Sequence, residues 1–371
     1  MDFSFSEEQQ EIQGLAAQIL GDKVTHERLK EVEAAPDWFD RDLWSELAKA
    51  GLVGIALPED AGGGGFGILE ASLALEEIGR TVAPVPYLAT VVLGALPIAE
   101  FGSDAQRRRL LPGVAEGSTV LTAALTEPLN PDPLTPATVA TPDASRWGLT
   151  GTKTLVPAAH LAAAMLVPAT TGDGSVGVFL VDPNAGGVKL ERLLTTSGEP
   201  QFTVELDGAA GEALGDPADG ARIVEWIVER ATAALCAVQL GVCEQALKMT
   251  AEYTSTREQF ERPLAAFQAV AQRAADAYID VEGVRLTAWQ AIWRLAEGLP
   301  AANELAVAKF WAAEGGQRVV HAAQHLHGGI GVDVDYPLHR YFVWAKQNEL
   351  TLGSATPQLV KLGAALAEEP V

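Results

Sequence analysis

The chain has 371 residues, of which 48% are hydrophobic, and a formal net charge of −23 at pH 7. This length is enough for two or three modules around a large core, and the apolar fraction excludes an intrinsically disordered protein. The negative charge argues against nucleic acid and anionic membranes as partners, so an anionic ligand would need basic residues placed locally against that field.

The apolar runs are broken by charges or prolines short of the length that spans a membrane. The chain starts with the acidic segment MDFSFSEE, which lacks a signal-peptide pattern, so we expect a cytoplasmic protein. Cys236 and Cys243 lie on one predicted helix, roughly 10 Å apart along its axis, which is too far for an unstrained disulfide. We therefore expect two buried free thiols.

Residues 1 to about 117 are predicted to be helical. Ser6 begins a helix-capping pattern, and apolar residues then return at helical spacing before Gly51 ends the run. These apolar residues are Ile12, Leu15, Ile19, Leu20, Trp38, Leu43, Trp44 and Leu47. Further helices are predicted over Phe66–Gly79 and Ala105–Leu111.

The segment Gly62–Gly67 matches the dinucleotide-binding pattern GxGxxG and precedes a predicted helix. A dinucleotide site also needs a strand before the glycines and a βαβ unit around them. Here the upstream chain is predicted to be helical and Pro58 adjoins the loop. The sequence therefore favours a glycine-rich connection between helices.

Between residues 118 and 218 the sequence consists of short runs that are rich in β-branched residues or that alternate between apolar and polar residues. Pro, Gly, Asp and Asn separate these runs. This spacing predicts an antiparallel β domain. The predicted strands are Thr119–Leu125, Thr154–Val156, Ala164–Val167, Val176–Val181 and Phe202–Leu206, and Trp147–Lys153 is predicted to be strand, turn and strand.

From about residue 219 to 371, apolar residues again recur every three to four positions in long runs. Four long amphipathic helices pack most economically as a four-helix bundle. The runs are Ile223–Tyr253, Phe267–Leu295, Asn303–His325 and Tyr336–Leu350.

Two segments in this last region carry a family resemblance. Gln324–Pro337 has the sequence QHLHGGIGVDVDYP, and Tyr253–Phe260 has the sequence YTSTREQF, followed by Pro263-Leu264 and Phe267-Gln268. Together they resemble the two signatures of the acyl-CoA dehydrogenase family, and the match continues over the whole chain in order. The resemblance implies an α+β fold with an N-terminal helical domain (residues 1–117), a central antiparallel β domain (118–218) and a C-terminal four-helix bundle (219–371).

The resemblance also implies a cofactor, FAD. In this family an Arg and a Gln from the two signatures clamp the FAD diphosphate across a subunit interface, and these match Arg257 and Gln324. A lone Arg257 would otherwise be expected in a surface ion pair with Glu258 or Glu261. Other positions that match family contacts to the cofactor are Gln259, Phe260, Phe267, Gln268, the backbone of Gly328 and Gly329, Thr126 facing the flavin ring, and Ser354.

The ring-facing positions depart from the family pattern. Thr126-Glu127-Pro128 resembles the family strand end, but the Gly-rich loop that follows it in the family is here Leu129-Asn-Pro-Asp-Pro. The family's aromatic-Ile-Thr becomes Leu155-Val156-Pro157, and proline has no backbone N–H to donate. Glu261 replaces the usual Gly beside the cofactor loop.

The catalytic base is the main absence. Dehydrogenation needs a carboxylate in a water-poor cleft to remove the α-proton of the thioester. The family's Glu-Gly-Thr loop is here Leu352-Gly353-Ser354, and an alternative base position on the first bundle helix is Ala231. Glu229 and Glu349 are poor substitutes by register, so the catalytic residue is unknown.

His321, His325 and His327 cluster in sequence but lack an acidic or Cys ligand at zinc-site spacing, so no metal is expected.

Three hypotheses remain open for an acyl-CoA substrate, with a bulky group such as a steroid side chain as a candidate. In the first, the chain is the base-less subunit of an α2β2 heterotetramer, as the family has for steroid-CoA esters, and completes an FAD site held mainly by a second acyl-CoA dehydrogenase-like subunit. In the second, it is an active homotetramer with a relocated base. In the third, it is a flavin-free scaffold. The electron acceptor implied by the family is an electron-transfer flavoprotein.

Overall fold

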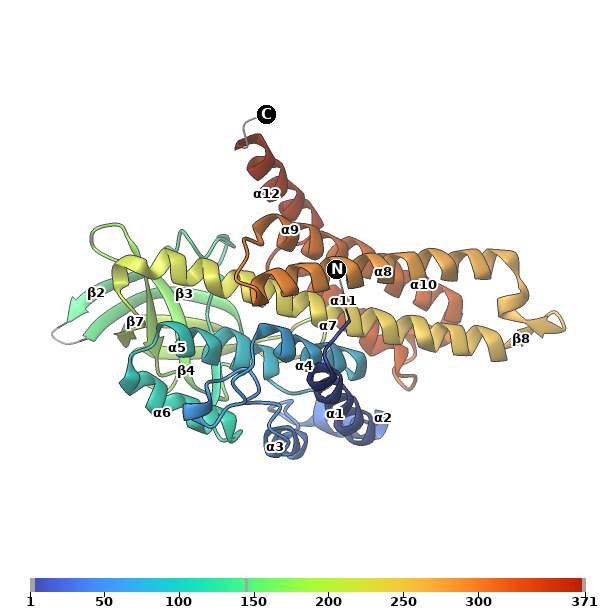
Figure 1. Cartoon of the computed structure of the whole chain (residues 1–371), viewed down its shortest axis with the longest axis horizontal. Coiled ribbons are helices and arrows are strands. Elements are labelled where there is room, and N and C mark those ends of the chain that lie inside the picture. Colours follow the sequence, from blue (N-terminus) through green and yellow to red (C-terminus); the bar gives the residue numbers. More distant parts are fainter. Residues whose placement is uncertain (1–3, 144–145, 369–371) are drawn as a thin grey trace. The chain divides into compact units, whose positions relative to one another are not determined.

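The computed structural model describes residues 4–143 and 146–368 (Figure 1). By packing, the chain divides into two compact units. The first, here called the helical unit, contains the residues up to Leu29, Ser72–Ala83 and the residues from Thr232 onward. The second, the sheet unit, contains Lys30–Ala71 and Pro84–Ala231. Because this division does not follow chain order, the predicted boundaries at residues 117 and 218 stay predictions. The expectation that the chain lacks a signal peptide rests partly on residues 1–3, which lie outside the described residues.

The first part of the chain is helical, as predicted. Ser6 caps the first helix, because its hydroxyl accepts from the Gln9 N–H and the Gln9 side chain accepts from the Ser6 N–H. The segment Leu88–Phe101 was not predicted, because its apolar run has no helical period. The helices are α1 (Glu7–Lys23), α2 (His26–Ala34), α3 (Arg41–Lys49), a 3-10 turn (Glu59–Ala61), α4 (Ile68–Thr81), a π-helical segment (Leu88–Ala95), α5 (Leu96–Phe101) and α6 (Asp104–Ala115).

The glycine-rich loop before α4 is a packing feature. Residues 53–56 form turns, so the loop does not follow a strand as a dinucleotide site would require. A Cβ at Gly63 would lie 2.2 Å from the carbonyl oxygen of Leu57, and Gly62 has φ +81°. The glycines therefore permit close backbone approach at this connection.

Seven strands form the central sheet, in the order β1-β4-β2-β3-β7-β5, with β6 pairing to β7 and β4 also pairing to β5. Two pairings, β1–β4 and β2–β4, are parallel, so the sheet is mixed where an antiparallel sheet was predicted. The strands are β1 (Val120–Ala123), β2 (Val139–Asp143), β3 (Arg146–Pro157), β4 (Ala162–Thr170), β5 (Val176–Val181), β6 (Val188–Leu193) and β7 (Gln201–Ala213).

The predicted strand-turn-strand at Trp147–Lys153 is wrong, because β3 runs through it. An irregularity in the pairing with β7 between Leu149 and Gly151 takes the place of a turn. A Cβ at Gly151 would lie 2.5 Å from the Thr138 hydroxyl, which explains the glycine without a turn.

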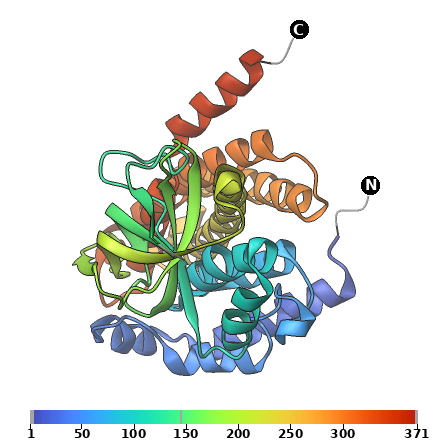
Figure 2. The same cartoon turned by 90° about the vertical axis from the view of Figure 1, so that its left-hand side faces the viewer.

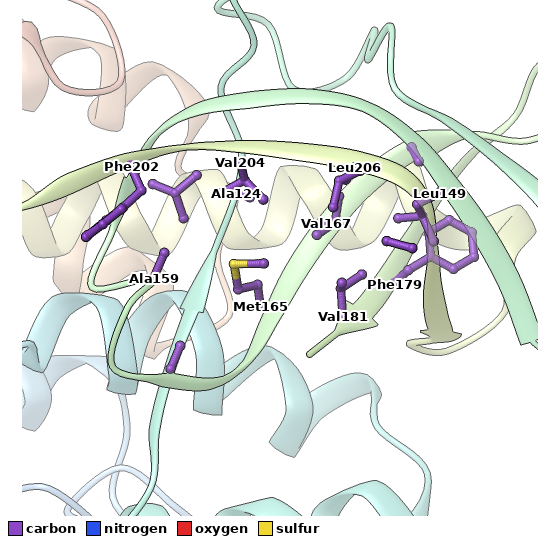
Figure 3. Packing of buried hydrophobic residues seen from close by; sticks show 14 of the residues in the cluster. Ala124, Leu149, Ala159, Met165, Val167, Phe179, Val181, Phe202, Val204 and Leu206 are labelled. Atoms are coloured by element: carbon purple, nitrogen blue, oxygen red, sulfur yellow. The ribbon is translucent and has the colours of Figure 1, made fainter. Parts of the chain in front are cut away.

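The core of the sheet unit lies between these strands. Figure 3 shows Met165, Phe179 and Phe202 among the side chains that gather there, and Met165 and Phe179 are fully buried. Small residues such as Ala124 and Ala159 belong to the same buried cluster as these larger side chains.

The C-terminal part holds the predicted long helices: α7 (Gly220–Thr256), α8 (Gln268–Ala296), α9 (Ala302–Phe310) continued through a π-helical turn (Trp311–Gly315) into α10 (Gly316–His327), and α11 (Leu338–Leu350). Helix α8 packs against α9 and α10, and α10 packs against α11. An additional helix, α12 (Ala355–Glu368), was not predicted. It packs against α9 and leads away from it (Figures 1 and 2).

Helix α7 corrects one expectation. The stretch Pro217–Thr256 is long and apolar enough to cross a membrane by length and composition, whereas the sequence was expected to hold no such run. Its most apolar window is 78% buried inside the structure, as in the core helix of a soluble fold. Gly241 of α7 lets α4 approach closely, since a Cβ there would lie 1.9 Å from the Glu76 carbonyl oxygen.

Candidate functional site

The first signature forms a short hairpin after α7. Its strands are β8 (Glu258–Gln259) and β9 (Arg262–Pro263), and the turn residues Phe260 and Glu261 have φ +53° and +62°. Positive φ at both turn residues is the geometry that usually selects Asn-Gly. Glu261 therefore occupies a backbone conformation that suits the glycine of the family pattern.

Two aromatic rings and an arginine side chain contact one another around the hairpin. The Phe260 ring is 87% exposed and meets Phe267 edge to face at 6.2 Å between centroids. The Arg262 guanidinium lies 4.0 Å from the centroid of the Phe267 ring. Gln259 and Gln268 are exposed. The hairpin thus presents the ring of Phe260 to solvent.

Arg257 follows α7 directly and is exposed. Its backbone is fixed, because its N–H donates to Tyr253 at 2.8 Å and its carbonyl accepts from Leu264 at 2.8 Å. Within the described residues its guanidinium has no side-chain partner, and the alternative ion pair with Glu258 or Glu261 is not formed. Its five donors are free for a ligand.

The second signature meets the first in the helical unit. The His327 ring stacks on Tyr253, with centroids 4.4 Å apart and planes at 19°. His327 Nδ1 lies 2.8 Å from the Ala323 carbonyl oxygen and Nε2 lies 3.3 Å from the Tyr336 hydroxyl. A neutral ring that donates through Nδ1 and accepts at Nε2 satisfies both contacts. Burial lowers the pKa of His327, which favours that neutral form.

This stack joins two predicted groups of residues. Tyr253 lies one helical turn before Arg257, and His327 directly precedes Gly328 and Gly329. Gly328 has φ +66°, and a Cβ there or at Gly329 would meet nothing within 4 Å. The glycines therefore leave bare, open backbone beside the end of α10.

A pocket of about 440 Å³ lies between α8 and α10, lined by Arg273, His321, Gln324, His325 and Gly328. It brings together Gln324 and Gly328 from the predicted set. Arg273 was missed, because a single arginine on a helix is ordinarily a solvated residue. The pocket offers a guanidinium, an amide and open backbone, which suit a phosphate-bearing group.

The ring-facing positions lie in the sheet unit. Thr126 is half-buried, and its carbonyl accepts from the Thr154 N–H at 2.9 Å. The neighbouring Glu127 forms a buried ion pair with Lys153, with Nζ 2.7 Å from Oε1. The Thr138 hydroxyl and the backbone N–H groups of Ala137 and Thr138 also donate to Glu127, at 2.6, 2.6 and 2.9 Å.

Sequence reasoning missed this pair, because a Glu and a Lys 26 residues apart carry no local signal of contact. Burial by itself raises the pKa of Glu127, but the hydrogen bonds from Lys153, Thr138 and the backbone outweigh it and lower the pKa to about 2. Burial lowers the pKa of Lys153, which is 0% exposed. The pair ties the segment after Thr126 to β3.

The strand that faces the ring in the family is altered here. Leu155 has φ +54° and is 51% exposed, at an irregularity in the pairing of β3 with β7 between Lys153 and Val156. The carbonyl of Pro157 accepts from the Thr122 hydroxyl at 2.7 Å. The departures noticed in the sequence therefore coincide with an irregular backbone.

Both family positions for a base carry apolar side chains. Leu352 has φ +59° in the loop after α11, where the Gln358 amide donates to its carbonyl at 3.0 Å. Ala231 of α7 is 1% exposed. Ser354 is half-buried in the same loop as Leu352. Neither base position can accept a proton.

Two acidic residues lie near these base positions in the sequence, and each has a basic partner. The Glu229 side chain is 38% exposed and lies 3.7 Å from Arg230, and burial raises its pKa. Glu349 pairs with Lys346 at 2.6 Å. Lys309, which sequence reasoning also missed, is fully buried and donates to the carbonyls of Asn348 and Glu349 at 2.8 and 3.1 Å. It closes the end of α11 just before the Leu352 loop.

The described residues hold no group of three or more His, Cys, Asp or Glu that could bind a metal ion, and the absence of a metal stays a prediction. Cys236 and Cys243 are buried and free, as predicted.

Comparison with known families decides the assignment. Residues 6–118 match the acyl-CoA dehydrogenase N-terminal domain, and residues 218–366 match the acyl-CoA dehydrogenase C-terminal domain. This chain belongs to the acyl-CoA dehydrogenase family. The expected fold, with N-terminal helices, a central sheet and C-terminal helices, is confirmed.

Three relatives are especially similar. The acyl-CoA dehydrogenase FadE27 of Mycobacterium tuberculosis is 43% identical over all of both chains. The solved Tcur3481–Tcur3483 steroid acyl-CoA dehydrogenase is 50% identical, with a TM-score of 0.92 and 98% coverage of each chain. The ChsE4–ChsE5 complex from Mycobacterium tuberculosis is 44% identical, with a TM-score of 0.95 and full coverage of both chains. The chain is thus close to steroid-type subunits of a family of FAD-dependent oxidoreductases.

The residues at the helix ends fit FAD. Arg257, which is unpaired among the described residues, and the Gln324 amide offer donors to a diphosphate. Gly328 adds an open approach and no further donor, since its N–H already donates to the carbonyls of Gln324 and His325. The sheet unit offers less to a flavin ring, since Pro157 lacks an N–H and Leu155 lies in irregular backbone.

Proposed function

We propose that this chain is the base-less subunit of a heteromeric acyl-CoA dehydrogenase. It supplies Arg257 and Gln324 to FAD held mainly by a second, acyl-CoA dehydrogenase-like subunit. The reaction is α,β-dehydrogenation of an acyl-CoA thioester, with a steroid side chain as the substrate class. An electron-transfer flavoprotein accepts the electrons, and the complex is cytoplasmic.

One observation carries this proposal. The two positions where the family places its base hold Leu352 and buried Ala231, while the guanidinium of Arg257 is kept exposed and unpaired among the described residues. A chain that had lost the cofactor altogether would have no reason to keep an exposed arginine without a partner among the described residues, in a protein of net charge −23.

The names of two solved relatives support an assembly of two different subunits. Two similar solved structures are named for pairs of proteins, ChsE4–ChsE5 and Tcur3481–Tcur3483, and the second is described as a steroid acyl-CoA dehydrogenase. In each of these two structures, the chain that matches this protein is similar to it over nearly its whole length.

FAD supplies the acceptor for a hydride from the β-carbon when it is bound. The part played by this chain is electrostatic. Arg257 offers a planar fork to two phosphate oxygens, and the Gln324 amide adds a neutral donor. The Tyr253–His327 stack and the backbone bonds of Arg257 hold these donors in place before the ligand arrives, which lowers the entropy lost on binding.

The test is the flavin content of the complex of this chain with its natural partner, measured from visible absorbance with both chains quantified. We expect about one FAD per two unlike chains, and Arg257→Ala should lower it. The matched control is Arg108→Ala, which removes an equally exposed arginine that has no partner among the described residues. Unchanged flavin in the Arg257 variant would refute the proposal, and a colourless complex would favour a scaffold.

A second candidate is an active homotetramer whose base is Glu229. Burial raises the pKa of this carboxyl, as a general base requires. This candidate predicts one FAD per chain and turnover by the chain alone, abolished in Glu229→Gln. Turnover that persists in that variant would eliminate Glu229 as the base.

A further inference from the structure

Most arginines from α7 to α11 have a contact partner within the protein. In the described part of the chain, each of them contacts a carboxylate, an aromatic ring, a carbonyl or a histidine, except two. The two are Arg257 and Arg273. Arg257 belongs to the family signature, whereas nothing has assigned a role to Arg273.

Arg273 lines the same pocket as Gln324 and Gly328. The lining of this pocket contains His321 and His325 but, among the described residues, no carboxylate. The acids near Arg273, which are Asp276, Asp280 and Glu314, line the adjoining pocket instead.

The adjoining pocket shows the contrast. It has a volume of about 420 Å³ and shares Arg273 and His321 with the first. Its other arginine, Arg318, is neutralised by Asp280 at 2.5 Å and Glu314 at 3.1 Å. Asp276 also lines this pocket but forms no ion pair with Arg273 in the part of the chain that the structure describes. Arg273 is therefore the cation left uncompensated on this face of the described chain.

We propose that Arg273 is a second guanidinium contact for the phosphate-bearing part of a dinucleotide, bound in the pocket with Gln324 and Gly328. The inference rests on the proposed function and extends it, since it adds Arg273 to the residues that would hold the ADP portion of FAD. An arginine fork binds a phosphate through two parallel hydrogen bonds. Gly328 has no side chain to block the approach, and even a Cβ at this position would meet no atom within 4 Å.

The geometry also separates this role from that of Arg257. Arg257 lies after the last turn of α7, on the side of the hairpin, whereas Arg273 projects from α8 into the pocket lining. Two guanidiniums, one from the segment after α7 and one from α8, would hold an extended diphosphate better than one, because each phosphate then has its own charged donor.

The experiment uses the full-length chain in complex with its natural partner and measures the dissociation constant of FAD, with ADP and adenosine as competing probes. Arg273→Ala should weaken FAD and ADP binding about tenfold, the loss expected for one charged hydrogen-bond donor, and leave adenosine unchanged. Arg273→Lys should give an intermediate loss, because it keeps the charge and loses the fork. Arg108→Ala is again the control for net charge.

The adenosine probe separates binding from folding, since a merely misfolded pocket would weaken adenosine as well. The affinity of ADP should also depend less steeply on salt in Arg273→Ala, because one fewer charge contacts the phosphates. If Arg273→Ala binds ADP as tightly as Arg108→Ala does, the inference is wrong. If Arg257→Ala still lowers flavin in that case, the proposed function stands without it, and if neither variant lowers flavin both fail.

Discussion

Replacing Glu127 by Gln removes one charge from the buried pair with Lys153 while it keeps the shape of the side chain. The carboxylate accepts four hydrogen bonds, from Lys153, the Thr138 hydroxyl and two backbone N–H groups. The amide can accept at only one oxygen, and it leaves the Lys153 ammonium buried without a counter-charge. We expect the sheet unit to lose stability.

The magnitude follows from the pKa of Glu127. Its value falls from 4.5 to about 2 on folding, and about 2.5 units at 1.36 kcal/mol each give about 3 kcal/mol. Breaking a buried ion pair by removing one partner costs about 3–5 kcal/mol, which agrees. Because the folded pKa is depressed, the contribution is present above about pH 4.5 and is lost as pH falls toward about 2.

The assay is urea unfolding of the wild type and Glu127→Gln at several pH values between 7 and about 3. The difference in unfolding free energy should be about 3 kcal/mol at pH 7 and should narrow as pH falls below about 4.5. Lys189→Met is the control, because Lys189 pairs with Glu205 on the exposed face of the same sheet, and it should change stability little. Equal effects of the two variants, or a difference independent of pH, would refute the reasoning.

Three other predictions concern separate parts of the molecule. Burial and the nearby Glu244 carboxylate raise the pKa of Glu76 from 4.5 to about 7, so the unfolding free energy should fall as pH rises from about 4.5 to about 7, and this fall should be shallower in Glu76→Gln. Glu261→Gly should raise the unfolding free energy by about 1 kcal/mol, because glycine adopts φ +62° without strain, and a decrease would contradict the turn geometry. Burial raises the pKa of Cys236 to about 12 and also raises that of Cys243, so neither thiol should react with a disulfide reagent until the protein is unfolded.

The elements that the sequence predicted well have strong local signals. The helices α7, α8 and α11 lie in runs with an apolar period of 3.6, and their predicted and observed ranges agree within a few residues. The start of α1 was predicted from the capping pattern at Ser6, but the run predicted up to Gly51 is divided into α1, α2 and α3. The strand β5 was predicted at its observed bounds, Val176–Val181, since it is flanked by turn residues. The segment Leu88–Phe101, whose apolar run has no helical period, was missed. Strand β6 was also missed, although glycine and proline residues flank it.

The residues of the candidate site also fall into those that the sequence indicated and those that it did not. Sequence alone pointed to Arg257, Gln324 and the glycines, and to the apolar residue Leu352 at the base position, because each lies inside a contiguous motif. Whether these residues contact FAD stays a prediction.

Only the tertiary structure showed that the two motifs meet, through the stack of Tyr253 on His327, and that Arg273 shares a pocket with Gln324. It alone also showed the buried Glu127–Lys153 pair. The physical reason is that periodicity and turn chemistry are properties of neighbouring residues, whereas burial, ion pairing and the absence of a partner depend on which distant segments pack together.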